Sequence, residues 1–392
     1  MLLSLALIFT FGLVLGELFG KIRLPKFLGM IITGILLGPF VLDLISDDIL
    51  IISSELRTIA LVIILLRAGL SLDISDLKKI GRPAILMSFI PATLEIIAVV
   101  IFAPMLFDIS YLEAAILGSV LAAVSPAVVV PKMIKLIADK YGYEKRVPQL
   151  IMASSSVDDI FVIVLFTSFL AMHQSGSFSI GSIALVPVAI ILGVLLGIIT
   201  GYLLSILFAK LRVRDTVKVL MILAVSFFIL SFEKDINEFV PLSALLSVMV
   251  LGITFLNQSQ ERAVRLQDKF DKIWVFAELV LFVLVGAAVD IRLAFAAGGL
   301  AIVLLIIELS FRLAGVQLSL IKTTLNKKEK AFAGISYIPK ATVQAAIGAI
   351  PLAMGVESGD LILALAVFAI IVTAPIGAIG IDLTYKRFLE KE

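Results

Sequence analysis

The chain has 392 residues, of which 61% are hydrophobic, and its 32 Lys and Arg residues against 30 Asp and Glu residues leave a formal net charge of +2. Soluble domains are about 45–50% apolar, so this composition, with a mean hydropathy of +1.17, excludes an ordinary soluble protein. The absence of cysteine excludes thiol chemistry and disulfides, the single His173 argues against a histidine-ligated metal, and the near-neutral charge gives no support for nucleic-acid binding.

Apolar segments long enough to span a bilayer, which takes about 20 residues, recur along the whole chain. The first, residues 1–20, lacks a basic flank and a small-residue cleavage site, so we expect a retained helix and not a signal peptide. We predict an all-α polytopic membrane protein with about 13 transmembrane helices. Their approximate bounds are 1–20, 24–42, 49–70, 83–107, 111–136, 147–172, 178–209, 216–232, 239–256, 272–290, 293–320, 330–355 and 360–385.

The positions of the basic residues indicate the orientation, because cytoplasmic loops of membrane proteins are enriched in Lys and Arg. With the N-terminus outside, 26 of the 32 basic residues fall in inward loops, two fall in outward loops and four lie within spans. We therefore expect an N-out, C-in topology in the cell (inner) membrane.

The fifth and twelfth spans are each interrupted by two prolines. The fifth contains Pro126 and Pro131, and the twelfth contains Pro339 and Pro351. Proline removes an amide donor and clashes with the preceding turn, so we expect a helix break at each of the four. Because the spans are seven apart, they run in opposite directions. Paired interrupted helices in inverted repeats indicate the midplane binding site of a transporter.

Charged residues within the spans gather at one depth. At about 1.5 Å of rise per residue, Glu95, Arg312, Lys340 and the aspartates at 158–159 all lie near the middle of a hydrocarbon core about 30 Å thick. A charge there costs at least about 2.5–3.5 kcal/mol, which indicates either a function or a buried partner. We interpret Glu95 and Arg312 as a structural ion pair, with Glu308, one turn before Arg312, as a competitor for it.

The adjacent aspartates Asp158 and Asp159 have only Lys340 left to neutralise them, so one acid is uncompensated. Neighbours on a helix point about 100° apart, and the two carboxylates therefore need not do the same job. A carboxylate neutralised in turn by a proton and by a cation makes the two ions compete for one place. The further oxygen ligands that we expect for the cation belong to Ser155, Ser125 and Val124.

Four motifs resemble those of a known family. They are LGMIITGILLGP (28–39), IILLRAGLSLD (63–73), SSSVDDI (154–160) and PKATVQAAIG (339–348). On these residues the chain resembles the monovalent cation/proton antiporter superfamily, and most closely the bacterial NHA-type sodium/proton exchangers, over nearly its full length. The last two motifs are the most specific, and the resemblance implies a fold like those of NapA and NhaA.

The resemblance also implies a division into domains and a homodimer in the lipid bilayer. An ion-transporting core would comprise 83–172 and 292–387, a dimerisation panel would comprise 1–72 and 215–290, and 178–209 would be a linker helix. We expect no soluble regulatory domain.

The resemblance further implies roles for single residues. Asp159 would bind the transported sodium and the proton in turn, while Asp158 would form a salt bridge with Lys340. Whether Lys340 is also a proton carrier, and hence whether transport moves net charge, stays open. Relatives often carry Thr or Thr-Asp before the first proline, and Val124-Ser125 stands there in this chain, so the choice among sodium, lithium and potassium is open as well.

The expected function is a sodium(lithium)/proton antiporter working by alternating access, without a cofactor and without enzymatic activity. A potassium/proton antiporter of the same fold and, more distantly, a cation channel are the alternatives. An intramembrane aspartyl protease is disfavoured, because its two aspartates lie on separate helices and share a water, which neighbours on one helix do not do easily.

Overall fold

The computed structural model describes residues 1–71, 81–174, 180–211, 213–237, 240, 242–290, 292–293 and 298–391, with the side chains of 174, 180–187 and 234 left aside. The end of the 63–73 motif lies outside these ranges. So do parts of the expected spans 178–209, 239–256 and 293–320. Throughout the described residues the secondary structure is helical, apart from one isolated bridge between Tyr141 and Lys391. The all-α class is therefore confirmed for this part of the chain.

Seven of the described helical segments are long and apolar enough to cross a membrane. They are Leu2–Lys21, Arg82–Phe107, Tyr111–Ala138, Val147–His173, Val188–Lys210, Gly298–Ser319 and Gly359–Phe388. A multi-pass membrane protein is the class that these helices define.

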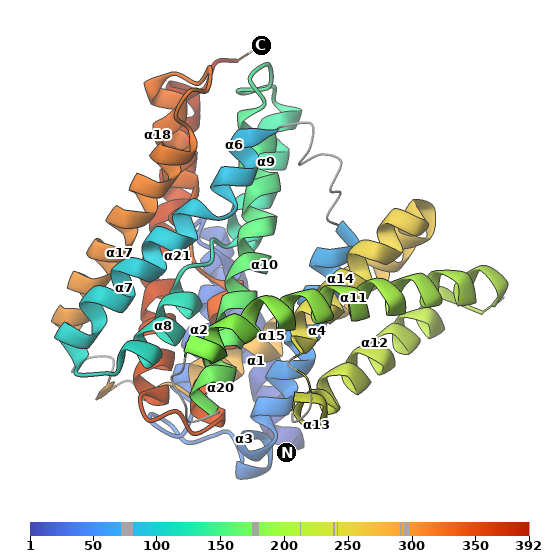
Figure 1. The fold of residues 1–392 in the computed structure, drawn as a ribbon. Coiled ribbons are helices and arrows are strands. Elements are labelled where there is room, and N and C mark those ends of the chain that lie inside the picture. The colour runs from blue at the N-terminus through green and yellow to red at the C-terminus, as the bar shows by residue number, and fades with distance from the viewer. Residues whose placement is uncertain are drawn as a thin grey trace. The chain divides into compact units, whose positions relative to one another are not determined.

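Contacts divide the chain into two units, which are described separately. The first comprises Met1–Arg57, Ser75–Val162 and Leu279–Glu392, and the second comprises Thr58–Ile74 and Ile163–Glu278. The helices that lie wholly in the first unit are α1 (Leu2–Lys21), α2 (Lys26–Leu37), α3 (Asp47–Ile51), α6 (Arg82–Met87), α7 (Ile90–Phe107), α8 (Tyr111–Leu121), α9 (Pro126–Ala138), α17 (Gly298–Ser319), α18 (Lys327–Ser336), α19 (Thr342–Ile347), α20 (Ile350–Ala353) and α21 (Gly359–Phe388). Figure 1 shows their arrangement.

The second unit contains α11 (Ile180–Lys210), α12 (Asp215–Ser231), α13 (Glu233–Asn237) and α14 (Ala244–Gln258). Helices α4 (Ser53–Ser71), α10 (Val147–Gln174) and α15 (Gln260–Ala287) belong partly to each unit. Small residues set the packing of α11 on α14. Gly193, Gly197 and Gly201 recur every fourth residue, and a Cβ on Gly197 would lie 2.6 Å from the backbone oxygen of Ser247. Such spacing lets two apolar helices approach closely within a membrane.

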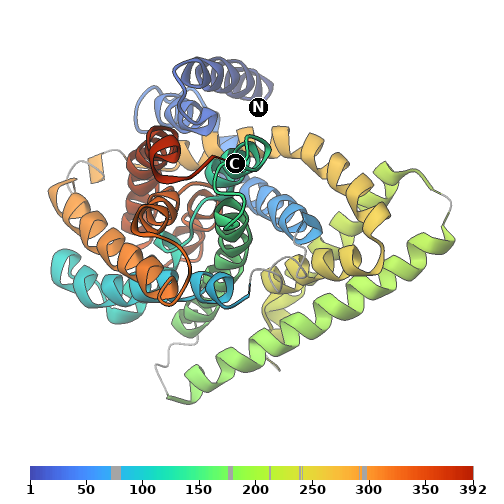
Figure 2. The same cartoon turned by 90° about the horizontal axis from the view of Figure 1, so that it is seen from above.

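The first unit is built around helices that neighbour one another in space. Helix α7 packs on α17, and α21 contacts α8, α9, α17, α18 and α19 (Figure 2). Apolar side chains fill the space between these helices, among them Met87, Val129, Met133, Phe332 and Ile381, all almost completely buried. This packing holds the two interrupted helices against each other.

The first interrupted helix breaks once, between α8 and α9. Helix α8 ends at Leu121, and α9 begins at Pro126, so the proline occupies the first turn, where its missing amide has no helical partner. Our expectation that Pro131 breaks the helix was wrong, since α9 continues through it to Ala138. A proline inside a helix removes a single hydrogen bond, and neighbouring helices make that loss tolerable at membrane depth.

The second interrupted helix breaks twice. Helix α18 ends at Ser336 and α19 begins at Thr342, with Pro339 inside the break. A second interruption at residues 348–349 separates α19 from the short α20, and Pro351 lies in the first turn of α20. Three short helices therefore replace the single span expected over 330–355.

Candidate functional site

The two breaks contact each other directly. The backbone amide of Ser125 donates a 2.8 Å hydrogen bond to the carbonyl of Pro339, which joins the first break to the second. At such breaks α8 and α18 end in carbonyls without helical partners, whereas α9 and α19 begin with free amides. We call the place where the two breaks meet the crossing. It presents partial negative charge from the carbonyls and partial positive charge from the amides within one buried space.

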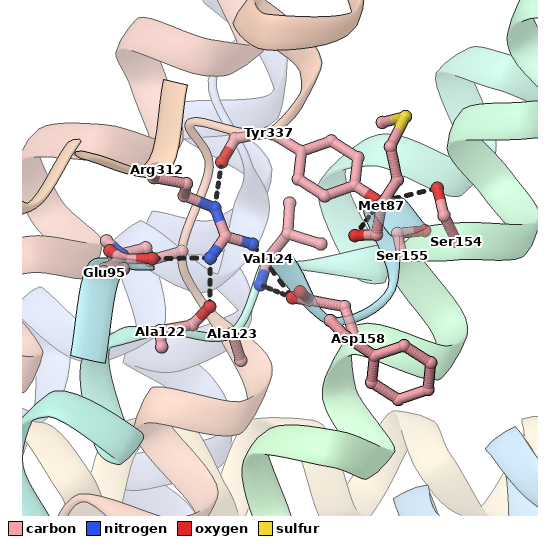
Figure 3. Close-up of polar contacts among 12 residues, drawn as sticks. Met87, Glu95, Ala122, Ala123, Val124, Ser154, Ser155, Asp158, Arg312 and Tyr337 are labelled. Atoms are coloured by element: carbon pink, nitrogen blue, oxygen red, sulfur yellow. Dashed lines mark hydrogen bonds and ion pairs between the residues drawn. The ribbon is translucent and has the colours of Figure 1, made fainter. Parts of the chain in front are cut away.

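Arg312, fully buried in α17, connects most of this space. Its guanidinium donates to Glu95 at 2.5 Å, to Asp158 at 2.9 Å and to the carbonyl of Tyr337 at 2.8 Å, and it also donates to the carbonyl of Ala122 (Figure 3). The expected contact between Glu95 and Arg312 is present. The planar guanidinium carries several donors in a fixed arrangement, so it can hold two carboxylates and two carbonyls at once.

Lys340, in the second break, contacts different carboxylates from the one that we expected. Its ammonium donates to Glu95 and to the carbonyl of Leu121 at 2.5 Å, and it lies 3.5 Å from Glu308. The expected salt bridge between Asp158 and Lys340 is therefore wrong. Glu95 lies between the two cations and contacts both, which leaves Arg312 as the partner of Asp158.

The two adjacent aspartates differ in their surroundings. One oxygen of Asp158, Oδ2, accepts from Arg312 and, at 2.9 Å, from the backbone amide of Val124 just before α9. Asp159 is also buried, with only 9% of its surface exposed. Unlike Asp158, it forms no ion pair with any Lys or Arg in the described part of the chain. The sequence prediction of two different roles for these carboxylates agrees with this asymmetry.

Five buried side-chain oxygens of the cluster have no hydrogen-bond partner among the described residues. They belong to Asp158 (Oδ1), Asp159 (Oδ1), Ser125 (Oγ) and Glu308 (Oε1 and Oε2), of which Oε1 of Glu308 lies 3.5 Å from the ammonium of Lys340. A buried oxygen without a donor is costly, and hard cations prefer oxygen ligands. The described residues contain no cluster of three or more His, Cys, Asp or Glu side chains suited to a resident metal. The unpartnered oxygens are therefore candidate ligands for a cation.

The hydroxyl of Ser155 and the backbone carbonyls of the first break are the other oxygens that we expected to bind the cation. The hydroxyl of Ser155 donates to the carbonyl of Met152 at 3.0 Å, which leaves its lone pairs as acceptors. The carbonyls of Leu121, Ala122 and Ala123 already accept hydrogen bonds from Lys340, Arg312 and Gln344. The part of the break that precedes Val124 is thus occupied by protein donors.

The charges of the cluster do not balance. Its buried members are Glu95, Asp158, Asp159, Glu308, Arg312 and Lys340. Four acids against two bases leave an excess of two negative charges if every group is ionised. An uncompensated buried charge is expensive, so the site requires protons, a bound cation or both.

Sequence reasoning missed several residues that complete the site. Tyr337 is fully buried, and its ring lies 5.3 Å from the guanidinium carbon of Arg312. Its hydroxyl donates to Ser154 at 2.5 Å (Figure 3). Thr373 accepts from the backbone amide of Lys340 at 3.0 Å. These residues are uncharged, so a search for charges at membrane depth passes over them, although polar residues within apolar spans carry a weaker signal of the same kind.

The fold and the site define the class of the monovalent cation/proton antiporters. The family model described as "Sodium/hydrogen exchanger, transmembrane" matches residues 5–387, and the chain belongs to this family. It is 33% identical to sodium/hydrogen exchanger 9B2 of Homo sapiens over 412 residues, which cover 100% of this chain and 75% of that protein. It is 32% identical to sodium/hydrogen exchanger 9B1 of Homo sapiens over 410 residues, with 100% and 78% covered.

A solved structure shares the fold. The sodium proton antiporter MjNhaP1 from Methanocaldococcus jannaschii, determined at pH 8, matches with a TM-score of 0.86 at 18% sequence identity. The match covers 98% of this chain and 97% of that one. Agreement over nearly the full length of both chains shows that they share one fold.

Proposed function

We propose that the protein exchanges sodium or lithium for protons by alternating access, with the cation and the proton competing for Asp159. The observation that carries the proposal is the carboxylate of Asp159, which is buried without an ion-pair partner among the described residues. A buried carboxylate in that position is stable when a proton or a cation neutralises it. Because one group cannot hold both, binding of one ion releases the other.

The neighbouring oxygens support a site for the cation beside Asp159. Asp158 keeps one oxygen on Arg312 and has the other unpartnered, and Ser125 adds a free hydroxyl oxygen. We propose these atoms, together with oxygens of Ser155 and Val124, as the ligands of the transported ion. Glu95 and Arg312 would then hold the crossing together without binding the ion.

The arrangement in the membrane also belongs to the proposal. We propose about 13 spans with the N-terminus outside the cell membrane, and a homodimer in which a core of 83–172 and 292–387 moves against a panel of 1–72 and 215–290. The hydrogen bond that joins the breaks of the two interrupted helices supports placing both helices in one core.

The test is transport by the purified protein in proteoliposomes. A pH-sensitive dye inside vesicles with an imposed proton gradient should report proton movement on addition of Na⁺ or Li⁺, and the apparent KM for Na⁺ should rise as the pH falls. A response to K⁺ alone would make the protein a potassium/proton antiporter. Cation flux without coupled proton movement would make it a channel and overturn the proposal.

We expect the exchange to be insensitive to membrane potential. Lys340 contacts Glu95, Glu308 and the carbonyl of Leu121 and not Asp159, so we propose that it is a structural partner and takes no part in the exchange. One proton then leaves for each sodium ion, and no net charge moves. The measurement is the initial rate in vesicles whose potential is set by valinomycin and a K⁺ gradient. A rate that follows the imposed potential would show that a second proton moves.

A further inference from the structure

Gln344 is a fully buried, uncharged residue in the first turn of α19, and it makes one hydrogen bond to the start of its own helix and two to the other break. Its side-chain oxygen accepts from the backbone amide of Ala341 at 2.8 Å. Its side-chain nitrogen donates to the carbonyl of Ala123 at 2.7 Å and to that of Leu121 at 3.2 Å. A single amide thereby joins the start of α19 to the end of α8.

The two interrupted helices begin in the same way, and this pair of helix starts sets a common register. Ser110 and Glu113 form a capping box at the start of α8, and Asn326 and Glu329 form one at the start of α18. The corresponding residues are 216 positions apart (326 minus 110, and 329 minus 113). Both halves therefore begin their interrupted helix in the same way.

This register shows what is unusual about Gln344. Ser125 donates directly from its backbone amide to the carbonyl of Pro339. The equivalent atoms in the other direction, 216 positions away in each case, are the amide of Ala341 and the carbonyl of Ala123. The side chain of Gln344 lies between these two, accepting from the first and donating to the second. The two breaks are therefore joined by a direct backbone hydrogen bond on one side and through the side chain of Gln344 on the other.

The inserted amide changes which oxygens face the ion. One of its two donor bonds occupies the carbonyl of Ala123, and the other shares the carbonyl of Leu121 with the ammonium of Lys340. The oxygens without a hydrogen-bond partner among the described residues of the site are then side-chain oxygens of Asp158, Asp159, Ser125 and Glu308. Cation selectivity depends on the number and rigidity of the oxygens offered, and backbone carbonyls in larger number serve potassium.

We infer that Gln344 is a specificity-determining residue: it withholds the carbonyl of Ala123 from the transported cation and so favours small ions over potassium. The inference rests on the proposed function and deepens it. Gln344 does not touch the ion itself. It acts by holding a backbone carbonyl of the first break in a hydrogen bond.

The experiment compares Gln344→Leu and Gln344→Glu with the wild type in proteoliposomes, using Na⁺, Li⁺ and K⁺ across a range of pH. Leucine has a similar volume and no donor, so the carbonyl of Ala123 loses its hydrogen bond, while that of Leu121 keeps the one from Lys340. The preference for Na⁺ over K⁺ should fall by about tenfold, the scale of one or two net hydrogen bonds. Glutamate can donate to Ala123 only when it is protonated, so Gln344→Glu should keep the wild-type preference in acid and lose it as the pH rises.

The matched control is Gln317→Glu, because Gln317 is exposed on α17 and donates only to the carbonyl of Lys330. It should leave both the preference and the pH profile unchanged. An unaltered ion preference and pH profile in the active Gln344 variants, with only a lower melting temperature, would overturn the inference and make Gln344 a structural residue. If Gln344→Leu does not fold, the pH profile of Gln344→Glu decides. A wild type without coupled exchange would instead overturn the proposed function.

Discussion

Asp159→Asn is expected to abolish sodium/proton exchange while leaving a folded protein. The amide has nearly the shape of the carboxylate, but it carries no charge for the cation and cannot bind and release the proton. Because Asp159 makes no ion pair in the described part of the chain, the substitution leaves no other buried charge without its partner. Exchange in proteoliposomes should fall to the level of empty vesicles, and the elution volume and melting temperature in detergent should stay near those of the wild type.

The control for this variant is Asp360→Asn, an exposed aspartate in the first turn of α21. It removes the same charge from the same unit and should leave exchange intact. Normal exchange by Asp159→Asn would exclude Asp159 as the carrier. The unpartnered oxygen of Asp158 would then be the next atom to test in the same way.

Arg312→Gln is expected to cause the largest loss of stability among single substitutions at the crossing. The substitution strands the fully buried Asp158, leaves the fully buried Glu95 with Lys340 as its remaining cation, and removes the donors to the carbonyls of Ala122 and Tyr337. Removing one partner of a buried ion pair costs about 3–5 kcal/mol in soluble proteins, because the remaining charge is left uncompensated. Unfolding in detergent, followed by the fluorescence of Trp274 or by light scattering, should begin at a clearly lower temperature.

The comparison for Arg312→Gln is Arg292→Gln. Arg292 is 78% exposed and pairs with Asp290, so water replaces the lost contact and the melting temperature should hardly change. If Arg312→Gln melts like the wild type and yet does not transport, Arg312 belongs to the ion pathway and not to the scaffold.

The amino-acid sequence predicts that the buried charges lie together, but not which of them pair. Counting residues along each span is enough to bring Glu95, Arg312, Lys340 and the two aspartates to one level, and the structure does bring them together. The pairing of Asp158 with Lys340 was wrong because it assumed one acid for each base. The choice of ion-pair partner depends on the rotation of each helix about its axis and on the fixed directions of the guanidinium donors. Neither can be predicted from the spacing of residues along the chain.

The prolines illustrate the same limit. Pro126, Pro339 and Pro351 lie at or beside interruptions, whereas Pro131 lies inside a continuous helix. A proline indicates that a helix lacks one hydrogen bond, but packing against neighbours decides whether the helix ends there. Gln344 could not be singled out from the sequence, because its importance comes from two carbonyls more than 200 positions away along the chain.

The distribution of charges between the two halves has a consequence for biosynthesis. Glu95, Asp158 and Asp159 are all translated in the first half, whereas Arg312 follows Asp158 by 154 residues and Glu95 by 217. During synthesis the first half therefore meets the membrane before either of its cationic partners exists. Its three carboxylates have to enter as neutral acids, or wait near water beside the insertion machinery, until the ribosome has delivered the second half.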